Sequence, residues 1–282
     1  MIFDLDFDDP MQLYALQYAV LGFVGLCIGS FFNVLIWRIP RGESIVWPPS
    51  HCTGCGGRIS AFDNFPVVSY IILGGKCRRC GSRISPVYPV VEIITAAVFV
   101  AVWRLLDVNL LNPWYLNLKP VFQVTSLMLL IPISVIDIRH YIIPDRFTLP
   151  FLLFSLGLSF VPDGVSASWY ANPLMSLLGA LAGGGTLFAV GAVGTFAMKK
   201  GDAMGMGDVK LMAYLGALWG YKAALLGIAF GALLGSVVGG IMILTKSLSD
   251  DHRIPFGPFL AAGTAIAVFA GEPLLQWYLS LF

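Results

Sequence analysis

Two carboxylates stand at the boundaries of long apolar runs in this sequence. Asp137 ends the apolar run 119–136, and Asp208 follows a Gly-Met-Gly stretch at the start of another run. An ionised carboxylate near hydrocarbon is costly, so such a group usually pairs, faces a water-filled cavity or takes part in chemistry. Two acids that share one proton can hydrolyse a peptide bond: one activates water and the other polarises the scissile carbonyl. The pattern therefore predicts an aspartyl protease site formed by Asp137 and Asp208.

Each acid also has an ordinary structural interpretation. Asp208 could cap the helix that follows it, because aspartate is a favoured N-cap residue, and Asp137 could be a boundary residue beside Arg139. Asp145 comes at the expected start of a helix, where N-capping is its expected role and direct catalysis the alternative. Lys210 could tune Asp208 or pair with it. These alternatives stay open at the level of sequence.

Four cysteines form two pairs with the spacing of a metal site. Cys52 and Cys55 make one Cys-x-x-Cys pair, Cys77 and Cys80 make the other, and 21 residues separate the two pairs. Four thiolates at this spacing are typical of tetrahedral zinc, and a filled coordination sphere indicates a structural ion. The alternative is free thiols or disulfides. His51 is expected to be a loop residue.

Composition defines the class of protein in which these residues must be placed. The chain has 282 residues, of which 57% are hydrophobic and only 12% charged, whereas a soluble domain carries about 25% charged residues. An apolar run of about 20 residues spans the hydrocarbon of a bilayer. We therefore predict an all-α polytopic membrane protein with about eight transmembrane helices, at 13–37, 86–106, 119–137, 147–161, 174–197, 208–220, 222–245 and 256–281.

The basic residues predict the orientation in the membrane. With the N-terminus outside, 14 of the 17 basic residues face the cytoplasm, and Arg104, Lys119 and Lys222 face the other side. The positive-inside rule thus favours an N-out, C-out topology with both acids at the cytoplasmic boundary. The 14 residues are Arg38, Arg41, Arg58, Lys76, Arg78, Arg79, Arg83, Arg139, Arg146, Lys199, Lys200, Lys210, Lys246 and Arg253.

This topology accounts for the basic residues, so the sequence gives no reason to expect nucleic-acid binding. A cleavable signal peptide is not expected either, since the first nine residues are acidic rather than basic. The four paired cysteines fall in a reducing compartment, which disfavours disulfides.

Three parts of the chain follow from this topology. Residues 1–37 form an acidic N-terminus and the first transmembrane helix, 38–85 form a small zinc-ribbon-like cytoplasmic insert, and 86–282 carry the acids. Glu92 lies in the first turns of the second span. It could be a carboxylate favoured by the helix dipole, or an inward-facing group that holds the insert or a ligand.

The chain resembles the type 4 prepilin peptidase family along nearly its whole length. The resemblance rests on several separate motifs that occur in the right order, and this combination makes it specific. Besides the two cysteine pairs, the motifs lie at 29–34, 38–40, 63–66, 85–92, 137–145, 205–211 and 254–259.

The resemblance implies a GxGD-type intramembrane aspartyl protease of the bacterial inner membrane, with Asp137 and Asp208 as its catalytic pair. Its substrates would be type IV prepilins or type II secretion pseudopilins, cut after a glycine that ends a short basic leader. Members with the cysteine-bearing insert also methylate the new N-terminus with S-adenosylmethionine. Glu92, followed by Asn33, Arg38 and Asp63, is the candidate for binding that cofactor.

Two other functions remain open at this stage. The first is a protease without methyltransferase activity, whose zinc loop is structural or docks substrate. The second is a zinc-assembled membrane transporter or scaffold that uses the acids for proton relay, although no inverted repeat is visible.

Overall fold

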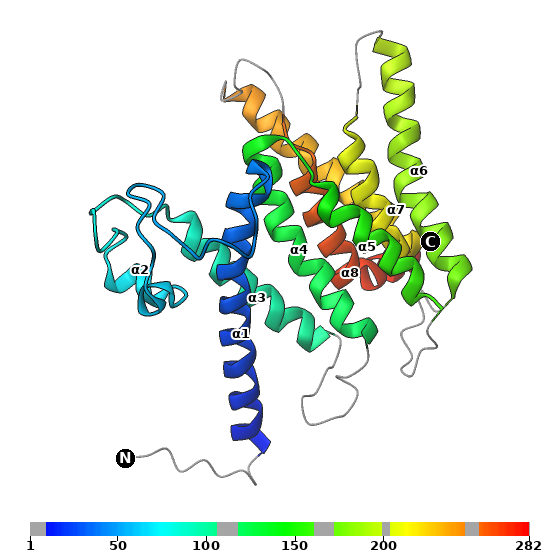
Figure 1. The fold of residues 1–282 in the computed structure, drawn as a ribbon. Helices are drawn as coiled ribbons and strands as arrows, with labels where there is room; N and C mark the ends of the chain where they lie inside the picture. The colour runs from blue at the N-terminus through cyan, green and yellow to red at the C-terminus, as the bar shows by residue number, and fades with distance from the viewer. Residues whose placement is uncertain (1–9, 106–117, 161–171, 199–203, 246–253, 282) are drawn as a thin grey trace. The chain divides into compact units, whose positions relative to one another are not determined.

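The computed structural model describes residues 10–105, 118–160, 172–198, 204–245 and 254–281. The described residues form helices, short 3-10 turns and two isolated β-bridges, which confirms the all-α prediction (Figure 1). The helices are α1 (Pro10–Arg38), α2 (Val68–Ile72), α3 (Val87–Leu105), α4 (Leu118–His140), α5 (Asp145–Leu158), α6 (Pro173–Met198), α7 (Met206–Leu244) and α8 (Gly257–Leu279). The 3-10 turns are η1 (Ile39–Arg41) and η2 (Ala61–Asn64).

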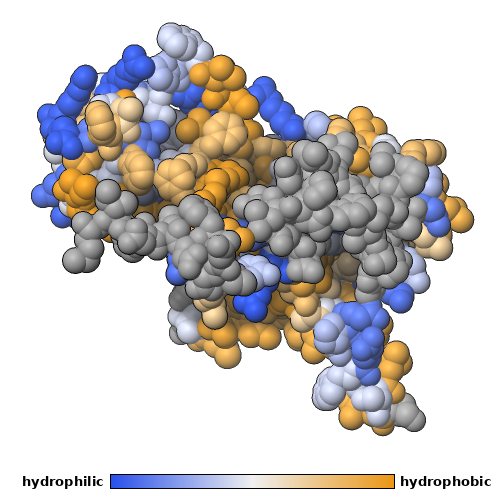
Figure 2. All heavy atoms as spheres, turned by 90° about the horizontal axis from the view of Figure 1, so that it is seen from below, coloured by the Kyte–Doolittle hydropathy of each residue, from blue (hydrophilic) through white to orange (hydrophobic). Residues whose placement is uncertain are grey.

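Six of these helices are long and apolar enough to cross a membrane, namely α1, α3, α4, α6, α7 and α8. Backbone polar groups in hydrocarbon must bond within the same segment, which explains why the long apolar runs are helical. Large apolar side chains also remain exposed on these helices, among them Phe188, Val193 and Leu233. Apolar side chains are exposed over much of the surface seen in Figure 2. The protein is therefore a multi-pass membrane protein.

The predicted sixth and seventh spans form one continuous element, α7, with a break at Gly220. The φ of Gly220 is 80°, outside the helical range, and glycine adopts such values without a Cβ penalty. A Cβ at Gly183 of α6 would meet both Met212 and Ala224. In a straight helix two residues twelve positions apart would lie about 18 Å apart. Thus α7 reverses direction at Gly220, close to where the sequence predicted a boundary (Figure 1).

The chain divides into two compact units, residues 1–132 and 133–282, with the boundary inside α4 at Pro132. In the first unit, α1 packs against α3 through two glycines. A Cβ at Gly25 would lie 2.6 Å from the Cα of Ala96, and one at Gly29 would lie 2.6 Å from the Cα of Glu92. Small residues four positions apart let membrane helices approach this closely. The segment between α1 and α3 contains the turns η1 and η2 and the short helix α2.

In the second unit, α7 packs against α6 on one side and α8 on the other. A Cβ at Gly179 would meet the backbone of Gly216, and one at Gly263 would meet Gly227 and Gly231. At these points one backbone contacts another, so the helices can approach this closely only because the contacting residues of both helices are glycines. These contacts hold α6, α7 and α8 together.

Candidate functional site

The second unit brings the two predicted acids into one site. Asp137 lies in the last turn of α4, and Asp208 lies in the first turn of α7. Ile143 lies beside a glycine neighbour of each acid: a Cβ at Gly257, which contacts Asp137, would be 3.1 Å from its Cδ1, and a Cβ at Gly207, which precedes Asp208, would be 2.8 Å from its Cβ. The surroundings of two acids 71 positions apart in sequence thus share one apolar side chain.

The Asp137 carboxylate is held by the start of α8. Its Oδ2 accepts a hydrogen bond from the backbone N–H of Gly257, with an N···O distance of 3.0 Å. Gly257 is the first residue of α8, so its amide is one of the unsatisfied donors at a helix N-terminus. The carboxylate is 6% exposed. A Cβ at Gly257 would lie 2.7 Å from Oδ2, so this contact requires glycine.

Asp208 has a buried oxygen without a partner. Its Oδ1 is inaccessible and makes no hydrogen bond with any residue that the structure describes. A buried polar atom of this kind needs an explanation, such as a catalytic role or a bound water. A Cβ at Gly205 would lie 3.0 Å from the other oxygen, Oδ2. The φ of Gly205 is −68°, which any residue adopts, so glycine is needed there for space beside the carboxylate rather than for backbone freedom.

The N-capping expected for Asp145 and considered for Asp208 is not found in the structure. The N-cap of α7 is Gly205 rather than Asp208, and the N-cap of α5 is Pro144 rather than Asp145. The N-capping expected for Asp145 is therefore wrong. Instead both of its oxygens lie 2.8 Å from Nζ of Lys210. The sequence did not decide which residue pairs with Lys210, and in the structure its partner is Asp145.

In the first unit the four paired cysteines are positioned to bind a metal ion. Their Sγ atoms all lie within 4.8 Å of one another, and the Sγ atoms of Cys52 and Cys80 are 3.9 Å apart. Tetrahedral zinc with Zn–S bonds of about 2.3 Å places sulfurs about 3.8 Å apart. All four thiols are free. The geometry fits a metal ion bound by four thiolates, and none of the four cysteines is in a disulfide.

The two cysteine turns have matching backbone hydrogen bonds. The N–H of Gly56 donates to the carbonyl of Cys52, and that of Gly81 donates to the carbonyl of Cys77. Both glycines have positive φ, 68° and 71°, which glycine adopts readily. His51 lies outside the sulfur cluster, and its Nδ1 is 3.3 Å from the carbonyl of Pro49, in agreement with the expected loop role.

A serine and backbone amides favour the thiolate forms of two of the four cysteines, Cys52 and Cys80. The Ser82 hydroxyl, followed by the backbone amides of Cys55 and Gly54, lowers the pKa of Cys52 to about 6. The same hydroxyl lowers the pKa of Cys80. Hydrogen bonds stabilise the charged form of a thiol, and the thiolate is the form that binds metal. Ser82 was not identified from the sequence, because a serine near cysteines gives no signal of its own.

Glu92 ties α3 to the insert. Its side chain is 7% exposed, and its Oε2 accepts a hydrogen bond of 2.8 Å from the backbone N–H of Val67. Val67 has a φ of 60°, which is rare for a β-branched residue, so the bond holds an unusual turn just before α2. Asn33 makes a similar link, from Nδ2 to the carbonyl of Tyr88 at 3.0 Å. Glu92 therefore holds the insert to α3, whereas Asn33 links α1 to the start of α3.

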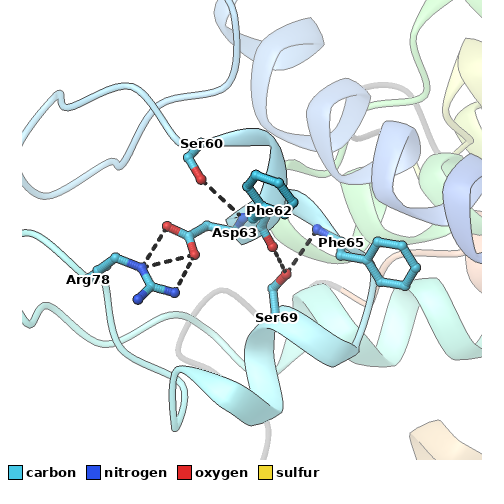
Figure 3. Close-up of polar contacts among 6 residues, drawn as sticks. All are labelled: Ser60, Phe62, Asp63, Phe65, Ser69 and Arg78. Carbon is cyan, nitrogen blue, oxygen red and sulfur yellow. Dashed lines mark hydrogen bonds and ion pairs between the residues drawn. The ribbon is translucent and has the colours of Figure 1, made fainter.

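Asp63 pairs with the second cysteine turn. Its two oxygens receive hydrogen bonds of 2.7 to 3.0 Å from Nε and Nη2 of Arg78 (Figure 3). Arg78 lowers the pKa of Asp63 through these bonds. Nearby, the Ser69 hydroxyl donates to the carbonyl of Phe62 and accepts from the N–H of Phe65 (Figure 3). These contacts join η2, α2 and the metal-binding loop into one folded insert.

The fold and the two sites define the class: a helical multi-pass membrane protein with a four-cysteine metal-binding insert and a pair of acids at helix ends. Residues 23–105 match the bacterial peptidase A24 N-terminal domain, and residues 124–241 match the type IV leader peptidase family. The chain belongs to the type IV leader peptidase family. No solved structure matches it.

Similar proteins from several bacteria carry the name prepilin leader peptidase/N-methyltransferase, and three of them illustrate the similarity. The protein from Bacillus subtilis is 33% identical over 93% of this chain and 98% of its own length. The one from Myxococcus xanthus is 38% identical over 80% of this chain and 64% of its own length. The one from Aeromonas salmonicida is 31% identical over 94% of both chains.

Proposed function

We propose that this protein is an intramembrane aspartyl endopeptidase that removes the leader of type IV prepilins or type II secretion pseudopilins. The observation that supports it most directly is the acid pair: Ile143 contacts the glycines beside Asp137 and Asp208, which come from different helices, and one buried oxygen of Asp208 has no partner among the described residues. The similarity to prepilin leader peptidases supplies the substrate class.

The surroundings of the two acids suggest different roles. Asp137 accepts the first N–H of α8, where the helix dipole favours negative charge, so we assign it as the ionised acid. It takes a proton from water, and the resulting hydroxide attacks the scissile carbonyl carbon. Asp208 carries the shared proton and donates a hydrogen bond to the carbonyl oxygen as charge develops there. When the C–N bond breaks, the proton on Asp137 passes to the leaving amine.

We further propose that the protein methylates the new N-terminal amine of the cleaved pilin. The relatives named N-methyltransferase support this second activity. S-adenosylmethionine, when bound, would supply an electrophilic methyl group to a neutral amine. We assign this activity to the unit that contains the insert 38–85, and peptide cleavage to the helices within 86–282. The alternative is a protease whose insert only docks substrate.

The metal is proposed to be one structural zinc ion held by Cys52, Cys55, Cys77 and Cys80. The sulfur spacing supports a tetrahedral ion. Metal would supply folding energy to an insert that has little core of its own. Metal analysis of the purified protein should find one zinc per chain, which is lost in the Cys52→Ser, Cys77→Ser double variant. A fully active parent without metal would contradict this assignment.

We place the protein in the bacterial inner membrane, with the N-terminus outside and the acids at the cytoplasmic face. Membrane lipid surrounds the apolar helices. Ten of the 14 basic residues assigned to the cytoplasmic side lie in the described part of the chain, whereas Lys199, Lys200, Lys246 and Arg253 lie outside the described residues.

The decisive experiment is to incubate the purified protein in detergent with a prepilin and S-adenosylmethionine, and to read the product by mass. The parent should release the leader after the glycine and add one methyl group. Asp137→Asn and Asp208→Asn should each lower the cleavage rate by about 100-fold or more, since each removes a proton-transfer group.

Asp145→Asn is the matched control, because Asp145 is a half-exposed acid paired with Lys210 and should keep near-parental cleavage. Normal cleavage by either of the other two variants would remove that acid from the catalytic pair. Cleaved but unmethylated product from the parent would favour the protease without transferase activity.

A further inference from the structure

A cavity of about 320 Å³ lies in the first unit, beside the C-terminal end of α1. One wall is a face of α1 that includes Ser30, Val34 and Arg38, and the opposite wall comes from the loop around Pro48 and the turn at Asn64. Its volume falls in the range of small-molecule sites, about 300–1,000 Å³. Neither Asp137 nor Asp208 lines it, and the peptide hydrolysis described above assigns no role to its lining residues.

Arg38 gives the cavity its chemical character. The side chain is only 4% exposed, and none of the ion pairs within the described ranges involves it. A buried charge is normally paired with an opposite charge, because desolvation is expensive. Its printed partners are neutral carbonyl oxygens: Nη1 donates to Ser44 and Nη2 to Pro48 and Pro49. Those bonds leave the positive charge uncompensated and Nε–H without a described partner.

The walls of the cavity are held in place before any ligand binds. The three carbonyl bonds of Arg38 fix the 44–49 loop against α1. On the opposite side, Glu92 holds the N–H of Val67, which adjoins the cavity residue Pro66. A preformed site loses less freedom on binding than a flexible one. Glu92 is thus a positioning residue for the wall, at a place where the sequence suggested a cofactor contact.

We propose that this cavity binds the methyl donor, with Arg38 pairing the carboxylate of its methionine part. The chemistry of the cavity matches the three parts of S-adenosylmethionine. The guanidinium suits a carboxylate, the hydroxyl and amide groups of Ser30, Ser50 and Asn64 suit ribose and base, and Val34 and Pro48 give apolar surface to the adenine. The proposal rests on the methyl transfer proposed above and locates its cofactor on this chain.

Direct binding of S-adenosylhomocysteine, the unreactive product of the donor, tests the site without relying on catalysis. Isothermal titration of the full chain in detergent measures its Kd. Val34→Trp places a large side chain in the cavity and should weaken binding by at least about 10-fold, as expected for overpacking a formed site. Val24→Trp is the matched control: Val24 lies on the same helix, is 39% exposed and does not line the cavity, so its Kd should equal that of the parent.

A second pair of measurements tests the role of the Arg38 charge. Decarboxylated S-adenosylmethionine lacks the carboxylate and should bind the parent about 10–100-fold more weakly than S-adenosylmethionine, the range for a charge-assisted hydrogen bond. Arg38→Gln keeps hydrogen-bond donors for the loop carbonyls but loses the charge. This variant should bind both compounds with similar, weak affinity, and thermal unfolding of the variant checks that the unit is folded.

The outcomes separate this proposal from the proposed function. A parent that methylates pilin but whose Kd is unchanged by both Val34→Trp and Arg38→Gln would overturn the cavity and leave the function standing. A parent that neither binds donor nor methylates would overturn both. The competing occupant of the cavity is a phospholipid, which native mass spectrometry can detect. A phospholipid that co-purifies with the parent and is lost in Val34→Trp, without any change in donor binding, would also overturn the proposal.

Discussion

At the scale of single residues, the acid site depends on one backbone amide. Gly257 donates its N–H to Asp137 and at the same time leaves the space that the carboxylate occupies. The hydrogen bond fixes one oxygen, and the start of α8 favours its negative charge. Asp208 has no comparable partner among the described residues. The difference between the two environments is what makes one acid suited to hold charge and the other to hold a proton.

Gly257→Ala should therefore reduce cleavage far more than it reduces stability. The new Cβ would lie 2.7 Å from Asp137 Oδ2, and the end of a side chain can move away at little cost in packing. The moved carboxylate would be misplaced for catalysis, and a displacement of about 1 Å can cost about 100-fold in rate. Cleavage rates and the melting temperature in detergent should be measured together.

Gly240→Ala provides the control for this substitution. Gly240 lies in α7, and a Cβ there would meet nothing within 4 Å. The Gly240→Ala variant should therefore cleave prepilin at the parental rate. Equal rates for Gly257→Ala and the parent would show that the Gly257 contact does not position Asp137.

At the scale of helices, the sequence predicted where the long helices lie along the chain, but not which helices pack against each other. The apolar runs predicted the long helices, because a backbone in lipid has no alternative to internal hydrogen bonds. The close contacts of α1 with α3 at Gly25 and Gly29 were not predicted, since a glycine becomes a contact only when a particular helix packs against it. Likewise the Lys210–Asp145 pair depends on how α5 and α7 meet, which local spacing does not specify.

The seam between α6 and α7 allows a stability test on neighbouring glycines. A Cβ at Gly183 would meet the backbone carbonyl of Met212, whereas a Cβ at Gly185 would meet nothing within 4 Å. Gly183→Ala should lower the free energy of unfolding by about 1–3 kcal/mol, as overpacking does. Gly185→Ala should leave it unchanged or raise it by up to about 1 kcal/mol, because alanine favours the helix. Unfolding in detergent with increasing denaturant measures both.

That pair of variants also tests the geometry of α7. Gly183 lies close to both arms of α7, near Met212 and Ala224, so it contacts the helix pair that carries Asp208. Similar stabilities for Gly183→Ala and Gly185→Ala would mean that the two helices do not pack as closely as the glycines indicate.

At the scale of the whole molecule, the acid pair constrains how often the chain crosses the membrane. If Asp137 and Asp208 form the proposed pair, the chain must return to the same membrane face between α4 and α7. The described residues between these two helices form α5 and α6. In that case α5, with 14 residues, crosses together with α6 although it is about 21 Å long and a bilayer core is about 30 Å thick. Tilted neighbours, local thinning or further residues after Leu158 must make up the difference.

The sequence predicted this segment as a short span, and hydropathy alone does not show that it crosses. Within the part of the chain that the structure describes, length and composition admit six helices as spans, and α5 is not one of them. If α5 stayed on the inner face, α6 would carry the chain outward and place Asp208 opposite Asp137. The crossing of α5 thus follows from the site rather than from the apolar pattern, since carboxylates on opposite faces could not share a proton.

Labelling of single cysteines with a membrane-impermeant maleimide can decide the topology. In a Cys27→Ala background, Phe160→Cys at the outer end of α5 should react in intact cells, because Phe160 is 75% exposed and follows an outward crossing. Glu43→Cys, in the exposed start of the insert, should react only after the cells are permeabilised, since the positive-inside rule places the insert in the cytoplasm. The parental background without added cysteine measures any reaction of the metal-binding thiols. Labelling of Glu43→Cys in intact cells would reverse the orientation. Protection of both cysteines in intact cells would leave α5 on the cytoplasmic side, and the two acids could then not form one catalytic pair.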